Sequence, residues 1–369
     1  MKFTVNRDVL IKELAKVQGV GERKSTVPIL ANALISAEAG KVSMLSTNME
    51  VGILTHVEVD VIEKGKTTAS AKLLYDVCRE MPEGTLDVET DEVFLKVRCG
   101  RSESKIVTLP ASDFPKVPLP GKTPKTTIES AKLIRMMDKV GFCASTDETK
   151  YHLNSIFIDD GANKGCLRMV STDGHRLGLI DEPLCDLEAI GAAKGILIPR
   201  KGAFELRKIM DTAKEVSIMV DAGYFYMFAD NAVVFVKEMD LEYPDYTRVI
   251  PTSNDKSFRV KKNDMLSALR RVSLMSAIKS KTVLFTLNQG GLVLSSKSPE
   301  AGEATEEIEV DYSKSSMEIK FNSKYIIDIL SSSSDEVLTF NMGDPLSPVL
   351  IKPDKETNDN LYVVMPMRL

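Results

Sequence analysis

The residues with the most evident chemical potential are Ser171, Asp173 and His175, which stand at alternate positions of one short segment. A serine, a carboxylate and an imidazole form the triad of many hydrolases, in which the imidazole accepts the serine proton and the carboxylate orients the ring. The rest of the sequence does not support that chemistry. It holds only three histidines, no GxSxG nucleophile turn and no Walker-type GxxxxGK phosphate loop. We therefore expect a protein that is not an enzyme and has no catalytic residue.

The cysteines do not indicate a cofactor or a metal either. They are Cys78, Cys99, Cys143, Cys166 and Cys185. Their number is odd, no two of them have CxxC spacing, and most stand beside apolar residues, so we expect reduced thiols in the interior. No cluster of histidine and cysteine has the spacing of a metal site. We expect neither a metal nor a cofactor.

A repeated register organises the elements that would carry any other function. It occurs without a gap in residues 5–17, 128–140 and 260–272. In each copy the apolar residues recur at i, i+1, i+4 and i+7, which is typical of an amphipathic helix, and a strand tail precedes it. The copies begin about one domain length apart, so the chain is predicted to hold three versions of one unit.

Each unit holds a second predicted helix and a set of predicted strands. The second helices match in charge at both ends and lie at 72–77, 201–206 and 324–329. Alternating stretches typical of antiparallel strands lie at 85–97, 216–228 and 337–351. This order predicts an α+β fold with the sheet on one side and the helices on the other. The predicted domains are residues 1–124, 125–252 and 253–369.

The composition predicts a globular protein with several cores. The chain has 369 residues, of which 43% are hydrophobic and 27% are charged, and this length is too great for one core. No apolar run approaches the roughly twenty residues of a membrane-spanning helix, and the first residues do not form a signal peptide. We expect a cytoplasmic location and no membrane contact.

Basic residues recur at equivalent positions of the predicted helices. Lys16, Lys139 and Arg271 share one column of the register, and Lys72, Lys201 and Lys324 share another. One interpretation is a solvated helix face, and the other is a surface that meets nucleic acid. The net charge of −5 excludes a protein that is basic on every side. A closed ring with basic helices inside and an acidic exterior would satisfy both observations.

Seven motifs then give the chain a resemblance that covers its whole length. They are residues 1–5 (MKFTV), 28–30 (PIL), 109–115 (LPASDFP), 172–177 (TDGHRL), 199–202 (PRKG), 244–251 (PDYTRVIP) and 362–369 (YVVMPMRL). In this order the chain resembles the beta sliding clamp family of bacterial DNA polymerase III. The resemblance implies three DNA-clamp domains and a head-to-tail homodimer that closes into a ring, with helices inside and sheets outside. It implies a DNA polymerase processivity factor that encircles double-stranded DNA of any sequence and slides along it.

The resemblance assigns the basic helix positions to the pore of the ring. There they would meet phosphates weakly, and retention on DNA would be topological. The residues expected to face DNA are Lys12, Lys16, Arg23, Lys24, Lys72, Arg79, Lys132, Arg135, Lys139, Arg200, Lys201, Lys208, Arg270 and Arg271.

The resemblance also implies a groove between the second and third domains that binds a short peptide with apolar anchors. The implied partners are the DNA polymerase III alpha subunit, the clamp loader delta subunit, and other polymerases or repair proteins that carry such a peptide. Independently, the Met-rich apolar chain end suits irregular apolar ligands. The structural alternatives are an ordinary turn at Asp173-Gly174 and a C-terminal strand that only completes a sheet. The expected lining is Leu153, Thr172, Gly174, His175, Arg176, Leu177, Pro244, Arg248, Val249, Val363, Val364, Met365, Pro366, Met367, Arg368 and Leu369.

For the dimer seam, the resemblance points to Leu274 and Met275 of the third domain meeting the strand around Ile106 of the first. It also implies that Glu300, Glu303 and Glu306 face basic residues such as Arg101. Two departures from the family pattern are Glu103, where a basic residue is expected, and Tyr151-His152, where two tyrosines are common.

The alternative function is a repeat scaffold that binds protein peptides and no nucleic acid. The column of Lys16, Lys139 and Arg271 argues against it, because a pure scaffold has no reason to keep basic residues there.

Overall fold

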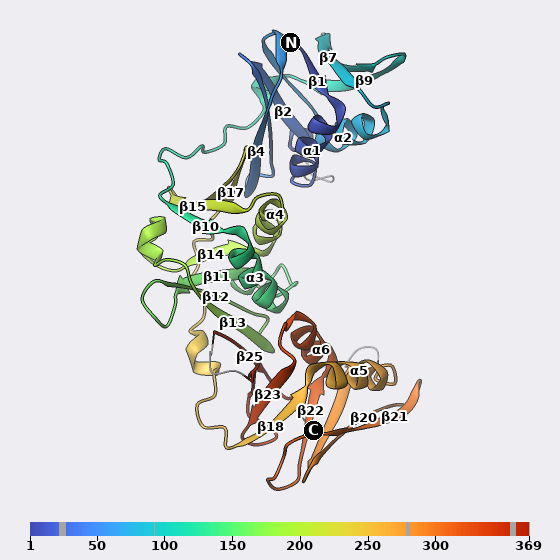
Figure 1. Ribbon diagram of the computed structural model, residues 1–369, viewed down its shortest axis with the longest axis vertical. Coiled ribbons are helices and arrows are strands. Elements are labelled where there is room, and N and C mark those ends of the chain that lie inside the picture. The colour runs from blue at the N-terminus through green and yellow to red at the C-terminus, as the bar shows by residue number, and fades with distance from the viewer. Residues whose placement is uncertain (22–26, 92, 278–280, 355–358, 369) are drawn as a thin grey trace. The chain divides into compact units, whose positions relative to one another are not determined.

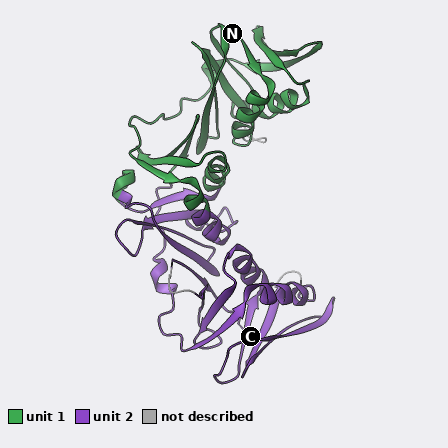
Figure 2. Ribbon diagram, viewed as in Figure 1, with its two compact units in different colours: residues 1–134, 188–193, 201–238 green, residues 135–187, 194–200, 239–369 purple. Residues whose placement is uncertain are grey.

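The computed structural model describes residues 1–21, 27–91, 93–277, 281–354 and 359–368 (Figure 1). Arg23, Lys24 and Leu369 lie outside the described residues. The chain forms two compact units (Figure 2). Unit 1 comprises residues 1–134, 188–193 and 201–238, and unit 2 comprises residues 135–187, 194–200 and 239–369. The division between the units passes through the second repeat, and the domain boundaries at 124 and 252 stay predictions.

Unit 1 is built on one antiparallel sheet of 13 strands. In sheet order these are β10 (Thr126–Glu129), β15 (Glu215–Asp221), β16 (Tyr224–Ala229), β17 (Ala232–Lys237), β4 (Val51–Glu58), β3 (Lys41–Thr47), β2 (Asn32–Glu38), β6 (Gly65–Ser70), β9 (Ser102–Leu109), β8 (Phe94–Cys99), β7 (Thr85–Asp91), β1 (Lys2–Asn6) and β5 (Asp60–Glu63). Strands of the first and second repeats meet where β4 pairs with β17. We call this pairing and the side chains around it the first junction.

Unit 2 holds two antiparallel sheets. The 8-stranded sheet has the order β14 (Ile196–Pro199), β11 (Ser155–Asp160), β12 (Cys166–Thr172), β13 (Arg176–Pro183), β25 (Asn360–Val364), β24 (Val349–Pro353), β23 (Val337–Met342) and β18 (Lys256–Lys261). The 4-stranded sheet has the order β21 (Gly302–Glu309), β20 (Gly291–Ser298), β19 (Thr282–Asn288) and β22 (Met317–Asn322). Strands of the second and third repeats meet where β13 pairs with β25. This pairing and its surroundings are the second junction.

The α-helices occupy the predicted registers, and the α+β class is confirmed. They are α1 (Arg7–Val17), α2 (Ala71–Glu80), α3 (Ser130–Val140), α4 (Arg200–Met210), α5 (Lys262–Ser273) and α6 (Ser323–Ser332). The equivalent residues Leu10, Leu133 and Met265 are buried, as the apolar column requires. Helix α1 begins after Asn6, whose side chain accepts hydrogen bonds from backbone N–H groups of the first turn. Short 3₁₀ helices lie at η1 (Pro28–Ala31), η2 (Ala111–Asp113), η3 (Gly141–Cys143), η4 (Tyr151–Leu153), η5 (Leu187–Ile190) and η6 (Tyr246–Val249).

The cysteines are free thiols, and Cys78, Cys99 and Cys143 are buried. Burial raises the pKa of the Cys78 thiol to about 12, so almost none of it is thiolate at neutral pH. In the described part of the chain, no helix is long and apolar enough to cross a membrane.

Candidate interaction sites at the junctions

At the first junction, strand β17 of the second repeat continues the sheet of the first repeat. Beyond the strand pairs, the Lys237 N–H donates to the Glu50 carbonyl at 2.6 Å. The turn before β17 packs onto the same strand, because Asn231 Nδ2 donates to the His56 carbonyl at 2.6 Å. Both ends of β17 are therefore held against β4.

A buried ion pair lies under this junction. Lys16, in the last turn of α1, is 5% exposed, and its Nζ lies 2.9 Å from Glu13 Oε2 and 2.7 Å from Asn231 Oδ1. The Thr55 hydroxyl donates to the same Glu13 carboxylate. One ammonium thus joins α1 to the turn of the next repeat. Lys16 was expected to face DNA, and its charge instead lies inside the chain.

The second junction repeats the backbone pattern of the first. Strand β25 pairs with β13, and the Met365 N–H donates to the His175 carbonyl at 2.8 Å. The tail beyond Met365 then reaches the 4-stranded sheet, where the Met367 N–H donates to the Lys320 carbonyl at 2.8 Å. The end of the chain therefore connects the two sheets of unit 2.

Arg176 is the central cation of the second junction and is 7% exposed. Its guanidinium donates to Asp328 Oδ2 on α6 at 2.7 Å, to Asp173 Oδ2 at 3.1 Å and to the Phe142 carbonyl at 2.6 Å. It also lies over the rings of Phe142 and Tyr325, at 5.2 and 4.7 Å from their centroids. A planar group with several fixed donors can join three segments at once, which an ammonium cannot do as well.

The loop 172–177 is fixed by its own hydrogen bonds. Asp173 Oδ1 accepts from the His175 N–H at 2.9 Å, and Thr172 Oγ1 accepts from the Gly174 N–H at 3.1 Å. Gly174 has φ +89°, where a β-carbon would be strained. The loop leaves His175 exposed, with its ring stacked on Tyr325 at a centroid distance of 6.1 Å.

The same loop excludes the hydrolase arrangement. Ser171 is fully buried, and its hydroxyl donates to the Val140 carbonyl. The His175 ring is exposed and stacks on Tyr325, whereas the Ser171 hydroxyl is bonded to a backbone carbonyl, so the two do not form a triad.

An apolar patch adjoins the loop. The cluster beneath it comprises Val170, Leu177, Leu179, Tyr246 and Val363, with Phe157, Tyr243, Ile250, Leu350 and Leu361 packed against it. At its margin Val249 is 42% exposed and Met365 is 37% exposed. We call loop 172–177, segment 244–249 and tail 363–368 the partner surface. Pro244 and Arg248 are exposed in it, and Arg248 pairs with Asp245 at 2.8 Å.

The structure adds two residues to the expected lining. Tyr325 and Asp328 of α6 reach the loop, although the sequence analysis did not assign them to a site. A signal was present, because both belong to the second repeated register. Leu153 lies half-buried in η4, beside the exposed Tyr151.

The residues expected to face DNA fall into groups with different surroundings. Lys139, like Lys16, is buried, with its Nζ 3.5 Å from Ser334 Oγ, and burial lowers the pKa of its ammonium. Ion pairs within the chain engage Lys72 with Asp76, Arg79 with Glu80, Lys132 with Glu129, Arg135 with Glu182 and Asp359, Lys208 with Glu205, and Arg271 with Glu306. Lys12, Arg200, Lys201 and Arg270 are exposed.

The strands expected at the dimer seam have open edges. Among the described residues, strand β21 ends its sheet and pairs with β20 alone. Strand β9 pairs with β8 along its length and with β6 only at Thr108 and Leu109. An open hollow of about 960 Å³ between α5 and β21 is lined by residues that include Arg271 and Glu306.

The side chains named for the seam differ in accessibility. Leu274 is 74% exposed at the end of α5, and Met275 is half-buried. Ile106 is only 2% exposed in the interior of its own sheet, and its neighbour Val107 is 65% exposed. Glu103, the departure from the family pattern, pairs with Arg98 at 2.6 Å.

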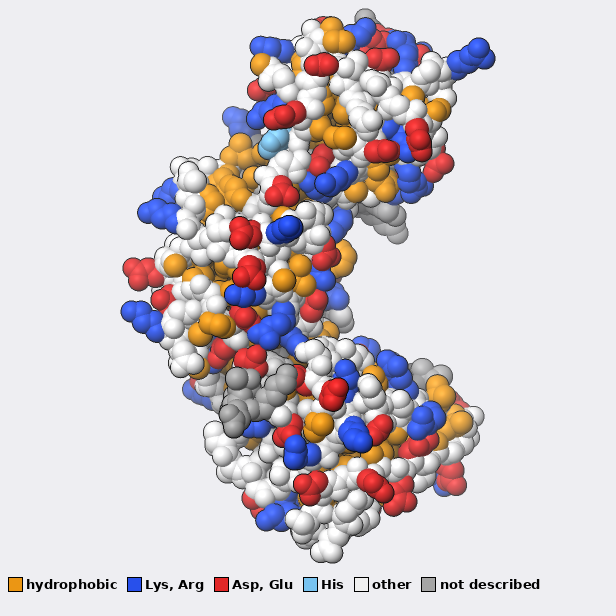
Figure 3. Space-filling view, viewed as in Figure 1, with side chains coloured by type: hydrophobic (Ala, Val, Ile, Leu, Met, Phe, Trp, Pro, Cys, Tyr) orange, Lys and Arg blue, Asp and Glu red, His pale blue; other side chains and the backbone are white. Residues whose placement is uncertain are grey.

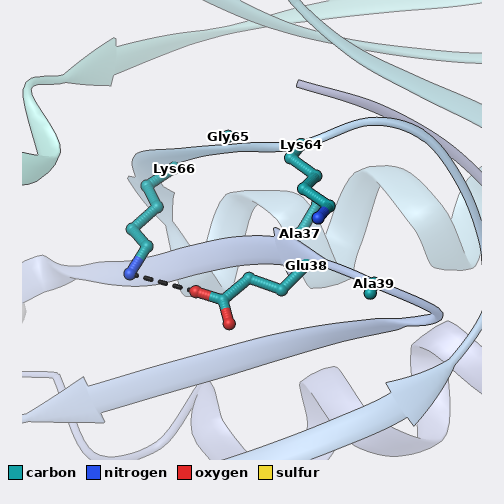
Figure 4. A pocket seen from close by; sticks show the side chains of 6 residues that line it. All are labelled: Ala37, Glu38, Ala39, Lys64, Gly65 and Lys66. Carbon is teal, nitrogen blue, oxygen red and sulfur yellow. Dashed lines mark ion pairs between the residues drawn. The ribbon is translucent and has the colours of Figure 1, made fainter.

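Other surface features carry less chemistry. The hollow at the β2–β3 hairpin is lined by small residues and two lysines, and one of them, Lys66, pairs with Glu38 at 3.2 Å (Figure 4). Acidic and basic side chains are interspersed over the face drawn in Figure 3. Within the described ranges, no group of three or more His, Cys, Asp or Glu side chains could hold a metal ion.

Comparisons with known proteins match the whole chain. Models of the DNA polymerase III beta subunit match its N-terminal domain at residues 1–118, its central domain at 127–245 and its C-terminal domain at 247–368. The chain is 36% identical to the beta sliding clamp of Caulobacter vibrioides over 377 residues and 34% identical to that of Pseudomonas aeruginosa over 375, with all of each chain covered. The DNA polymerase III subunit beta of Bartonella birtlesii, solved bound to griselimycin, is 34% identical with a TM-score of 0.94, and both chains are covered fully. The DNA polymerase sliding clamp of Caulobacter crescentus gives 34% and 0.93 at the same coverage.

Proposed function

The chain belongs to the beta sliding clamp family, the DNA polymerase III beta subunits, and we propose that two copies close head to tail into a ring around double-stranded DNA. Its function is that of a non-catalytic processivity factor of DNA polymerase III. The observation that carries the ring is the pair of open strand edges, β21 and β9. We infer a cytoplasmic location from the same role, since the ring must meet chromosomal DNA.

The internal junctions indicate which strands would pair at the seam. In each repeat the strand after the first hairpin receives the last strand of the next repeat: β4 receives β17, and β13 receives β25. In the third repeat, the strand equivalent to β4 and β13 is β21. In the first repeat, the strand equivalent to β17 and β25 is β9. Both strands have an open edge in the described part of the chain, so β9 of a second copy is the strand that fits β21. This contact is heterologous and closes into a ring with two copies.

Carrying the internal register over to the seam gives specific cross-strand pairs. The position of Gly52 in β4 corresponds to Glu303 in β21, and the position of Phe235 in β17 corresponds to Lys105 in β9. Glu303 would therefore lie opposite the partner's Lys105, an opposite-charge pair of the kind that stabilises antiparallel strands. Arg101 corresponds to Asn231 of the first junction, which places the partner's Arg101 beside Glu306. Glu103 would lie opposite Thr305 and keep its own Arg98.

The exposed end of α5 supports the same seam. Leu274 stands two residues after the valine that closes the helical register, as Phe142 does in the second repeat. Phe142 packs against Tyr362 of the next repeat at a ring-centroid distance of 5.9 Å. We expect Leu274 to make the corresponding contact with the partner copy.

Changing Leu274→Ala together with Met275→Ala should convert the dimer into folded monomers. Central interface anchors often cost about 2 kcal/mol or more each when truncated. Multi-angle light scattering at low micromolar concentration is the measurement, with Leu346→Ala as the control, because Leu346 is 62% exposed elsewhere in unit 2. A double variant that stays dimeric would show that the seam lies elsewhere.

For DNA contact, the exposed basic residues are the best supported part of the expected set. Lys12, Arg200 and Arg270 are exposed and can meet phosphates, whereas Lys16 is held in a buried ion pair and Lys139 is itself buried. Contact of this kind is independent of base sequence and is weakened by salt. Retention would come from closure of the ring, which agrees with a net charge of −5.

Reversing Lys12, Arg200 and Arg270 to Glu should leave the dimer intact and reduce loading onto nicked circular DNA. Lys64→Glu, in the turn before β6, is a charge-reversal control, and each single reversal at Lys12, Arg200 or Arg270 is compared with it; the control should have no effect. The unmodified ring should stay on circular DNA through gel filtration and leave when that DNA is cut. Equal retention on circular and linear DNA would contradict encirclement.

We also propose that the partner surface binds a short peptide carried by the DNA polymerase III alpha subunit, the clamp loader delta subunit and other polymerases or repair proteins. Its support is an exposed apolar margin at Val249 and Met365 over a packed cluster, beside a loop whose polar backbone is fixed. Adaptable Met side chains favour a surface that accepts several related ligands.

A labelled pentapeptide that begins with Gln and ends with Leu-Phe should bind at micromolar strength, about −8 kcal/mol. Deleting residues 365–369 should abolish this binding and leave the dimer assembled. Fluorescence anisotropy gives the affinity, and light scattering checks the assembly. Unchanged affinity in the truncated chain would place the peptide site elsewhere.

A further inference from the structure

The two junctions match residue by residue, although they do not carry the same side chains. Four positions of the second junction carry the partner surface: His175, Leu177, Val363 and Met365. Strand pairing aligns Leu177 opposite Val363 in the second junction with Gly52 opposite Phe235 in the first. The backbone bond from Met365 to His175 aligns with the bond from Lys237 to Glu50. The first junction therefore repeats the strand pairing of the partner surface with different side chains at these four positions.

In the first junction an aromatic ring fills the central position. A β-carbon on Gly52 would lie 1.9 Å from Cζ of Phe235, so the ring occupies the space that a side chain would need there. Phe235 is 2% exposed and packs in a cluster with Leu45, Phe114 and Tyr226. The first junction thus pairs the large Phe235 with a glycine, whereas the second pairs two residues of medium size, Leu177 and Val363. Either combination fills the interior.

The rim of the first junction is charged where that of the second is not. Glu50 takes the place of His175, and Lys237 takes the place of Met365; both are exposed. An apolar peptide side chain that approached this position would have to displace the Phe235 ring and desolvate two charges. Burying a charge without a partner is strongly unfavourable.

We propose that the first junction is a blocked copy of the partner surface. The pair Gly52–Phe235 closes the position of the apolar anchors, and Glu50 and Lys237 make its rim unsuitable for them. We therefore expect each chain to accept one partner peptide, at the second junction, where the buried, medium-sized Leu177 and Val363 take the places of Gly52 and Phe235. This inference rests on the peptide-binding role proposed above for the partner surface.

Moving the block into the second junction tests the inference. Leu177→Gly together with Val363→Phe reproduces the blocking pair on a backbone that already accommodates it in the first junction. We expect the affinity for the labelled pentapeptide to fall at least a hundredfold in fluorescence anisotropy, with the melting temperature and the dimer retained. Leu361→Val is the matched control, because it gives the neighbouring pair the residues Leu and Val of the first junction and should not change the affinity.

A second variant keeps the test decisive if the first does not fold. His175→Glu with Met365→Lys transfers only the exposed rim, and we expect at least a tenfold loss of affinity. Wild-type affinity in the folded pair-transfer variant, or in the rim variant, would overturn the block; loss of binding in the chain that lacks residues 365–369 would then show that the partner surface still holds. Failure of the unmodified chain to bind the peptide would instead contradict the partner surface, and the inference with it.

Discussion

At the first junction the buried cation is a lysine at the end of α1, whereas at the second it is an arginine on strand β13. Lys16 holds Glu13 and the turn residue Asn231 inside the chain, whereas the Nζ of its equivalent in the second repeat, Lys139, lies 3.5 Å from Ser334 Oγ. The position of Arg176 is taken in the first junction by Val51. Each junction thus contains one buried cation with several hydrogen-bond partners, and the two cations occupy positions that are not equivalent in the repeats.

This difference determines what each junction presents to solvent. The lysine cluster lies under the first sheet pairing, where the charge of Lys16 is buried among Glu13, Thr55 and Asn231. Arg176 holds a surface loop and α6 together, and that loop keeps His175 exposed beside an apolar patch. The repeat duplicates the backbone pairing, and the side chains of a few positions decide whether the result is a closed contact or a binding surface.

The largest expected effect comes from breaking the lysine cluster. Lys16→Met leaves the Glu13 carboxylate buried without its partner, which should lower the free energy of unfolding by about 3–5 kcal/mol. Lys139→Met should cost much less, because Lys139 gives up fewer contacts. Denaturant titration combined with hydrogen exchange of the β17 amides measures both, and Lys12→Met on the exposed side of α1 is the control. Equal losses in the two lysine variants would remove the contrast between the junctions.

An intermediate effect is expected from Arg176→Lys. The substitution keeps the charge but cannot serve Asp173, Asp328 and the Phe142 carbonyl together, so at least one buried polar group loses its partner at roughly 1–3 kcal/mol. Peptide affinity should fall with it, because loop 172–177 loses its anchor to α6. Anisotropy and denaturation on the same variant give the two values, and Arg248→Lys serves as the exposed control. A variant with full stability and full affinity would show that Arg176 does not organise the partner surface.

The smallest effect concerns Glu205 of α4, which corresponds in register to Asp328 but has no arginine. It is 9% exposed, and Lys208 lies 3.7 Å from its Oε2, beyond hydrogen-bond range. Burial raises the pKa of the Glu205 carboxyl. Because the folded-state pKa is then above the unfolded one, this group favours folding at low pH, and its contribution is lost as pH rises through that window.

Replacing Glu205 by Gln should therefore stabilise the chain at neutral pH by about 1 kcal/mol or less. It should also flatten the pH dependence of the melting temperature over the range that begins at the ordinary pKa of a glutamate carboxyl and extends above it. Thermal melts across that range are the measurement, with Glu215→Gln as an exposed control. A steeper pH dependence in the Gln variant would contradict the assigned shift.

The fold could be predicted from the sequence because the same apolar pattern occurs three times. The apolar columns at Leu10, Leu133 and Met265 recur in three copies, and such columns are kept for packing, so periodicity alone located α1, α3 and α5. The strand stretches were located for the same reason. The division of the chain into units was not reached, since strand pairing between repeats depends on contacts that no local pattern encodes.

Only part of the candidate site could be predicted from the sequence. The basic column predicted one shared role for Lys16, Lys139 and Arg271, but their partners Asn231, Ser334 and Glu306 are distant in sequence or belong to other elements. The spacing of charged residues along a helix does not reveal whether a given side chain faces solvent or a neighbouring repeat. The blocking role of Phe235 was likewise invisible, because it depends on the glycine that lies opposite it in the sheet.

The central claim, that one junction binds partners and its structural copy does not, is tested most directly by the stoichiometry of peptide binding. Isothermal titration of the unmodified dimer with the Gln-first, Leu-Phe-ended pentapeptide should give one equivalent site per chain. Two sites per chain would contradict the account, because the first junction would then be open.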